Sequence, residues 1–146
     1  MQVDFYHLTT MPLDRVLPRI AERVLEGGGR LVVVSADERQ RSALDRLLWT
    51  YSADSFLPHA LAGGDADHRQ PVLIAGDLAA PNQARHAAIV DGEWRDAALA
   101  FDRAFHFFDE EWIAAARIAW QTLADRPDAE RRYWKQNDAG RWERLA

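Results

Sequence analysis

Short apolar runs alternate with amphipathic stretches along this chain. Apolar and polar positions alternate at Val3–Leu8, and short apolar or aromatic runs follow at Leu31–Val34, Val72–Ala75, Ala87–Val90 and Phe105–Phe108. Alternation is typical of a strand with one exposed face, and an all-apolar run is typical of a strand buried on both faces. We therefore predict a strand at each of these runs.

The first helix is predicted between the first two strands. Its apolar stripe has the spacing i, i+3, i+4, i+7 and i+11 and consists of Leu13, Val16, Leu17, Ile20 and Val24. Pro18 lies within this stripe, which predicts a kink or a later start of the helix. Gly27–Gly29 predicts its end.

Three more helices are expected. Ser35–Glu38 has the S-x-x-E form of a capping box and predicts the start of the second helix. The pattern of Glu93–Ala104 predicts the third. The acids of Asp109–Glu111 favour the start of the fourth, which runs to about Leu123.

Arg131–Leu145 has the pattern of a hairpin, with its turn at Asn137–Gly140. Upstream of it, strands alternate with helices, which implies a mostly parallel sheet covered on both faces. The prediction is an α/β fold, a Rossmann-like three-layer domain with a mostly parallel central sheet. One domain is expected to span residues 1–146.

The stretch Leu47–Gly63 carries more apolar surface than a connection needs, since most connections have about 4–6 residues and are polar. Its large or rigid apolar side chains are Trp49, Tyr51, Phe56, Leu57 and Pro58. These side chains either fill the protein's own core or form a surface for another molecule. The sequence leaves both interpretations open.

Composition narrows the functional classes. The chain has 18 Lys and Arg against 23 Asp and Glu, a net charge of −5, which argues against direct binding of nucleic acid. It has no cysteine, which excludes thiol chemistry and cysteine-based zinc sites and fits a cytoplasmic location. No apolar run reaches the ~18 residues of a membrane span, so no membrane association is expected.

The charge is distributed unevenly. Residues 117–146 hold seven Lys and Arg against five Asp and Glu, while the remainder of the chain is strongly acidic. A basic C-terminal end on an acidic body favours a small acidic ligand at that end.

Motifs for catalysis or cofactor binding are weak. Gly27–Gly29 follows a helix and precedes a strand, the reverse of the order in a phosphate-binding loop. The histidines are scattered and lack metal-ligand spacing: His7, His59, His68, His86 and His106. Ser35 lacks a G-x-S-x-G elbow. We therefore expect no catalytic residue, no metal and no cofactor.

Tryptophan is unusually frequent. The six residues are Trp49, Trp94, Trp112, Trp120, Trp134 and Trp142. This is more than a core of this size usually absorbs, and tryptophan is enriched at the hot spots of protein interfaces. The count favours a protein that binds other proteins.

Three segments resemble the chi subunit family of bacterial DNA polymerase III holoenzyme. They are VDFYHL, GGGRLVVVSADERQRSALDRLLW and, most specifically, LLWTYSADSFLPHALAG with its L-W…S-F-x-P-H pattern. The ending YWKQNDAGRW is also similar to that of many chi sequences. The resemblance implies a Rossmann-like fold without nucleotide chemistry. It also implies a non-catalytic accessory subunit, associated with the clamp loader in DNA replication.

The resemblance further implies two partners, the psi subunit and the acidic, Phe-ended C-terminal tail of single-stranded-DNA-binding protein (SSB). The family's psi surface corresponds to Trp49, Phe56, Pro58 and His59. A large aromatic side chain and a proline-stiffened loop would make an anchor of low entropy. The alternative is that Trp49 and Phe56 pack this stretch onto the sheet.

The family's SSB-tail site lies on the last long helix and the strand before it. Arg117 and Trp120 share a helix face at i, i+3, and Gln121 follows them. Phe107 or Phe108, at the end of the preceding strand, would complete an apolar pocket for the ligand's Phe, while Arg117 binds the terminal carboxylate. The alternative is a core Trp120 beside a solvated Arg117.

The sequence departs from some family members at this site. Gln121 and Ile113 stand where those members have Lys, which would weaken binding of the tail. Three cations of the C-terminal segment could compensate for this loss: Arg131, Arg132 and Lys135.

Two other functions stay open. One is a small Rossmann-like enzyme that processes a nucleotide or phosphoester at the strand ends, since fold alone does not decide function. The other is an adaptor that uses the Trp49 surface for a different partner, such as a DNA-repair helicase.

Overall fold

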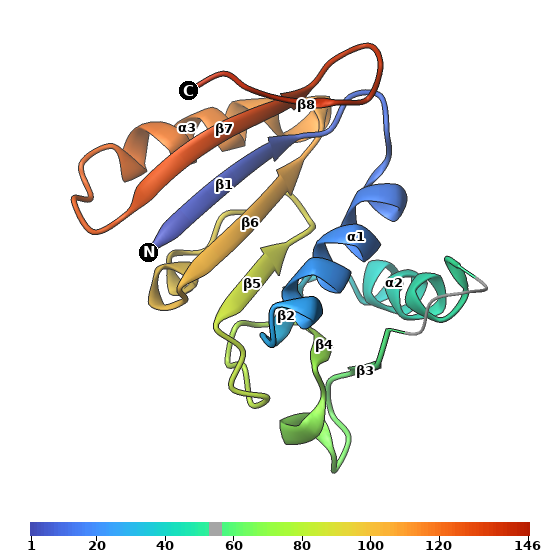
Figure 1. Cartoon of the computed structure of the whole chain (residues 1–146). Coiled ribbons are helices and arrows are strands. Elements are labelled where there is room, and N and C mark those ends of the chain that lie inside the picture. Colours follow the sequence, from blue (N-terminus) through green and yellow to red (C-terminus); the bar gives the residue numbers. More distant parts are fainter. Residues whose placement is uncertain (53–56) are drawn as a thin grey trace.

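The computed structural model describes residues 1–52 and 57–146. Over these residues, eight strands form one sheet in the order β3-β4-β2-β5-β6-β1-β7-β8 (Figure 1). The strands are β1 (Gln2–His7), β2 (Leu31–Val34), β3 (His59–Leu61), β4 (Val72–Ala75), β5 (His86–Ile89), β6 (Arg103–Phe108), β7 (Glu130–Gln136) and β8 (Trp142–Arg144). The helices are α1 (Leu13–Glu26), α2 (Glu38–Thr50) and α3 (Ile113–Leu123), with the short 3-10 helices η1 (Asp67–Arg69), η2 (Asp96–Ala100) and η3 (Glu110–Trp112).

The sheet is mostly parallel, as predicted. In the described part of the chain, every neighbouring pair of strands is parallel except β7 and β8. β7 and β8 form the expected C-terminal hairpin, in which Gly140 adopts φ +77° within the turn. Both the α/β class and the three-layer architecture are therefore confirmed.

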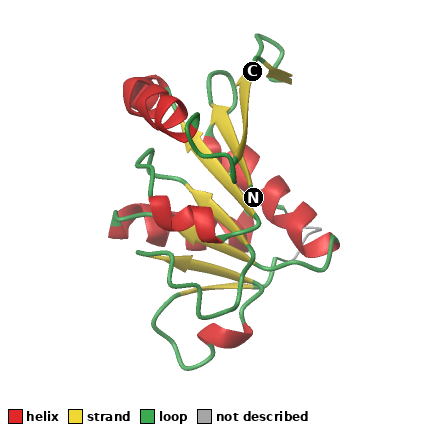
Figure 2. Cartoon of the chain, turned by 90° about the vertical axis from the view of Figure 1, so that its left-hand side faces the viewer, coloured by secondary structure: helices red, strands yellow, loops and turns green. Residues whose placement is uncertain are grey.

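Helices lie on both sides of the sheet (Figure 2), and the core has two halves, one on each face. On one face, Leu17 of α1 and Leu44 of α2 pack in the same cluster as Phe107 of β6. On the other face, Ala116 of α3 packs with Phe5 of β1. Successive side chains of a strand point to opposite faces, so β1 and β6 contribute large apolar residues to both halves.

Helix α1 begins at Leu13 and continues through Pro18, which is buried. The expectation of a later start is therefore wrong. Val16, Leu17 and Ile20 are buried on both sides of Pro18. Their packing compensates for the backbone hydrogen bond that proline cannot donate.

The predicted helix at Glu93–Ala104 is wrong. Only the short η2 forms there, and Arg103 and Ala104 already belong to β6. Arg103 pairs in register with Gln2, and its Nε donates to Asp4 Oδ2 at 2.7 Å. This contact across the sheet requires an extended backbone at Arg103, where the local sequence pattern favoured a helix.

The capping residue of α2 also differs from the prediction. Asp37 caps the helix, because its carboxylate accepts from the backbone N–H of Arg39. Ser35 lies before the cap, where its Oγ accepts from the N–H of Asp37 and donates to Gln40. The acidic side chain two residues further on thus takes the role that we gave to Ser35.

The stretch Leu47–Gly63 is not one long connection. Trp49 lies within α2, and His59–Leu61 forms β3, a strand that the sequence did not indicate. Three residues are too few to show a periodic pattern, which explains the omission. Residues 53–56, and with them Phe56, lie outside the described residues.

Candidate functional site

Trp49 is the most exposed tryptophan of the described chain. It lies near the C-terminal end of α2 with 57% of its surface exposed. Its ring centroid is 4.8 Å from that of His59 on β3. The neighbouring Pro58 is half-buried. We call Trp49, Pro58 and His59 the Trp49 surface.

His59 is the buried member of this surface and packs against Trp49. Its side chain is buried, with Nδ1 2.6 Å from the carbonyl oxygen of Leu57 and Nε2 3.1 Å from that of Asp45. Leu57 is 2% exposed and belongs to the core on the α1 face. Leu57 therefore fills the core, while the indole of Trp49 stays largely outside it.

A second candidate site is a cavity of about 290 Å³ between α3 and the C-terminal ends of β1 and β7. Its lining includes Ile113, Arg117 and Trp120 of α3, together with His7, Tyr133 and Lys135 from the strands. We call it the α3 cavity. It brings together Arg117 and Trp120, as the i, i+3 spacing predicted.

Trp120 is half-buried, so its side chain is neither wholly in the core nor wholly exposed. Its ring packs edge-on against Phe5 and Tyr133, at centroid distances of 5.3 and 5.6 Å. The guanidinium carbon of Arg131 lies 4.1 Å from its centroid, and Arg131 Nη1 donates to the carbonyl oxygen of Trp120 at 2.6 Å. Trp120 therefore contacts the core and the cavity at once.

Three predicted residues do not line this cavity. Phe107 is 1% exposed and lies on the opposite face of the sheet, with α1. Phe108 lies on the α3 face but is 2% exposed, and its ring stacks with His7 at 5.2 Å. Gln121 is exposed on α3, outside the lining.

Sequence reasoning missed His7 and Tyr133 as cavity residues. Alternation along β7 would have found Tyr133, because Arg131, Tyr133 and Lys135 point to one face of a strand. Arg132 points to the other face and pairs with Glu130 at 2.8 Å. Of the three cations expected to compensate, only Lys135 lines the cavity, while Arg131 lies against the ring of Trp120.

The lining of the α3 cavity includes two cations. Arg117 and Lys135 are exposed cations of its lining, while the exposed Glu110 lies just outside, with Oε1 2.9 Å from His7 Nε2. Burial raises the pKa of the Tyr133 phenol, which stays neutral and provides apolar surface near neutral pH. The cavity thus offers cations beside aromatic rings.

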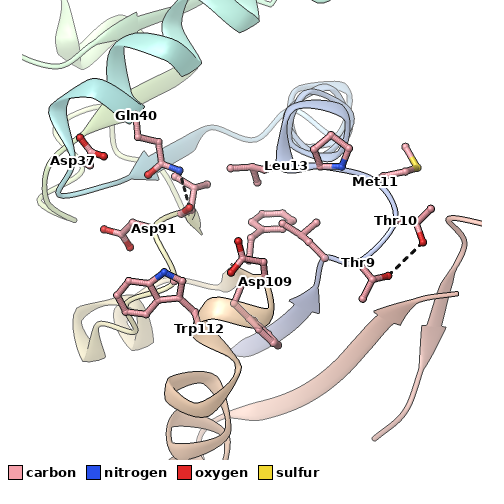
Figure 3. Close-up of a pocket in the computed structure, with 15 residues that line it drawn as sticks. Thr9, Thr10, Met11, Leu13, Asp37, Gln40, Asp91, Asp109 and Trp112 are labelled. Atoms are coloured by element: carbon pink, nitrogen blue, oxygen red, sulfur yellow. Dashed lines mark hydrogen bonds between the residues drawn. The ribbon is translucent and has the colours of Figure 1, made fainter. Parts of the chain in front are cut away.

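A larger cavity, about 650 Å³, lies at the carboxyl ends of the strands (Figure 3). This is where ligands bind in open parallel sheets, so it tests the enzyme hypothesis. Its charged lining residues are Asp37, Asp91 and Asp109, and the described residues that line it include no Lys or Arg. Such a lining repels a phosphoester.

Each of these aspartates has a structural role. Asp37 and Asp109 cap α2 and η3. Burial opposes ionisation of Asp91, but hydrogen bonds from Arg95, Ala36 and Glu93 hold its pKa below the usual value. In the part of the chain that the structure describes, no group of three or more His, Asp or Glu side chains is placed to hold a metal ion.

These features define the class of the protein as a three-layer, Rossmann-like α/β domain with two candidate surfaces outside the acidic cavity of Figure 3. A family model described as DNA polymerase III chi subunit, HolC, matches residues 1–128. The chain therefore belongs to the DNA polymerase III chi subunit family. Within the described residues, no helix has the length and apolar character of a transmembrane span.

The curated relatives that the chain matches are also chi subunits. The chain is 41% identical over 69 residues to the DNA polymerase III subunit chi of Pseudomonas aeruginosa, covering 45% of this chain and 49% of the relative. It is 36% identical over 63 residues to that of Escherichia coli K12, covering 43% of each. A probable chi subunit of Rickettsia prowazekii is 28% identical over 89 residues, 61% of this chain and 54% of the relative. The matches span about half the length of these relatives.

Proposed function

We propose that this chain is a non-catalytic adaptor of the bacterial replicase that binds the psi subunit and the C-terminal tail of SSB through two separate surfaces. The Trp49 surface serves psi, and the α3 cavity serves the tail. Linking two contacts raises the effective concentration of the replicase at SSB-coated DNA. The exposure of Trp49, at 57%, is the observation that carries the proposal.

Two features support the psi assignment. A tryptophan in the last turn of a helix would cost little entropy to order, since the indole already rests against the buried His59. Tryptophan is also the residue whose truncation most often weakens an interface. A helicase that uses the same surface would compete with psi.

The assignment of the α3 cavity to the SSB tail rests on its chemistry. Arg117 and Lys135 suit a terminal carboxylate and the acidic residues before it, and the edges of Trp120 and Tyr133 suit the ring of the terminal Phe. Neither Phe107 nor Phe108 belongs to this version of the site. Ile113 stands where some family members have Lys, so at this position the lining is apolar and not charged.

Co-purification tests the whole proposal. The tagged chain, psi and SSB are mixed, and Trp49→Ala and Arg117→Ala are introduced separately. Trp49→Ala should lose psi and keep SSB, whereas Arg117→Ala should keep psi and lose most of the SSB. The proposal of two independent surfaces is contradicted if either variant loses both partners. It is also contradicted if both variants keep both partners.

The enzyme hypothesis has a separate test. Nucleotides and phosphoesters should not raise the melting temperature of the protein, because the strand-end cavity is lined by aspartates. An SSB tail peptide should raise it. A nucleotide that stabilises the protein through this cavity would favour the enzyme.

A further inference from the structure

A groove on the α1 face of the sheet has no part in the proposed function. Two adjoining cavities of about 210 Å³ each form it between α1 and the strands β1, β6 and β7. Tyr6, Ile20 and Arg23 line both cavities, so the two lie side by side. The α3 cavity lies on the other face of the sheet and shares none of their lining residues.

One wall of the groove is a row of arginines. Arg15, Arg19 and Arg23 follow one another at i+4 spacing on α1, so they lie about 6 Å apart along one side of the helix. All three are exposed, and none forms an ion pair or side-chain hydrogen bond with another described residue. Among the described residues, no Asp or Glu lines either cavity.

The floor of the groove is aromatic. Trp134 and Trp142, both half-buried, lie next to Tyr6, with ring centroids 6.4 and 4.9 Å from its own. Trp134 Nε1 donates to Oδ1 of the buried Asp4 at 3.0 Å. The other oxygen of Asp4 accepts from Arg103 at 2.7 Å, so the floor is held in place and the charge of Asp4 is neutralised.

The backbone below this floor has no free hydrogen-bonding groups for a ligand. β1 is paired on both sides, with β6 and β7. An extended peptide could not add a strand there, which disfavours the usual mode of binding a peptide along a sheet. The polar side chains that the groove offers a ligand are mainly guanidinium groups, beside ring and aliphatic surfaces.

We propose that this groove binds single-stranded nucleic acid. The arginine row follows the phosphates, and bases stack on Trp134 and Trp142, which is the arrangement of grooves that hold single strands without reading sequence. The net charge of −5 predicted no such binding, but the fold collects unpaired cations on one side of α1. Both tryptophans lie beyond residue 128, where the family match ends.

Fluorescence anisotropy with a labelled oligothymidylate of about 15 nucleotides tests the proposal. Binding should weaken with salt, with a slope of about −2 in the logarithmic plot if three phosphates are contacted. Combined Arg15→Ala, Arg19→Ala and Arg23→Ala should reduce affinity at least about tenfold. Trp142→Ala should also weaken binding, and the oligonucleotide should quench tryptophan fluorescence of the wild type.

The matched control removes three exposed arginines elsewhere, through Arg39→Ala, Arg46→Ala and Arg69→Ala. This variant should bind like the wild type, and thermal melting should show that both triple variants are folded. Equal loss of affinity in both triple variants would overturn the proposal, as would no binding at low salt. Arginine-dependent binding of a polyglutamate peptide, without binding of the oligonucleotide, would assign the groove to an acidic protein instead.

Discussion

The ring of Trp49 on α2 lies 4.8 Å from the ring of His59 on β3, at an angle of 58° between the two planes. His59 is buried and close to two carbonyl oxygens, so it has little freedom to move. It restricts the indole above it, which leaves a large apolar group exposed but already positioned. This is the state in which an aromatic side chain anchors a partner at the lowest entropic cost.

Trp49→Ala should weaken psi binding by at least about 2 kcal/mol, because it removes the central aromatic anchor. Isothermal titration with psi measures the loss. The melting temperature should change little, since the side chain is mostly exposed. The matched control is Trp112→Ala, which removes the other exposed tryptophan of the described chain and should leave psi binding unchanged.

Arg117→Ala should weaken binding of an SSB tail peptide by about 1.5–3 kcal/mol, the usual contribution of a hydrogen bond to a charged group. Raised salt should also weaken the wild-type complex. Gln121→Lys should strengthen it modestly, since it adds a cation next to the site. An Arg117→Ala variant with full affinity, or salt-independent binding, would assign the tail to another surface.

Arg131→Ala should lower the free energy of unfolding by about 1–2 kcal/mol, since Arg131 stacks on Trp120 and donates to its carbonyl oxygen. Urea denaturation measures the change. The control is Arg132→Ala on the same strand, whose solvent-accessible pair with Glu130 should contribute little to stability. Equal effects of the two substitutions would show that the Trp120 contact adds nothing.

His106 should make the protein less stable as the pH falls. Burial lowers its pKa to about 4, and both ring nitrogens lack a hydrogen-bond partner among the described residues. Rings of Phe5 and Trp94 surround it at 5.3 and 5.6 Å, while Asp91 and Arg95 act on it with opposite sign. The unfolded chain therefore binds a proton between about pH 6.5 and 4 that the folded chain does not.

His106→Phe removes this protonation. At pH 5 the wild type should lose about 2 kcal/mol of stability through His106 relative to pH 7, and the variant should not. Denaturation at both pH values measures the difference. His68→Phe, at an exposed histidine, is the control and should keep the pH dependence of the wild type.

Local patterns were sufficient for most of the elements. The buried strands, the stripe of α1 and the C-terminal hairpin follow from periodicity and turn residues, because these signals arise within a few neighbouring positions. The helix predicted at Glu93–Ala104 failed because the contact between Arg103 and Asp4 joins strands far apart in the sequence. Local propensity carries no information about such a contact.

The candidate sites, too, were predictable from the sequence only in part. The residue types, the i, i+3 pairing of Arg117 with Trp120 and the surplus of tryptophans were legible in the chain alone. Which aromatic residues remain at the surface was decided by the packing of the sheet, which buries Phe107 and Phe108 on opposite faces and leaves Trp49 exposed. The basic groove is likewise a product of tertiary structure, since net charge is a sum over the chain and binding responds to charge at one place.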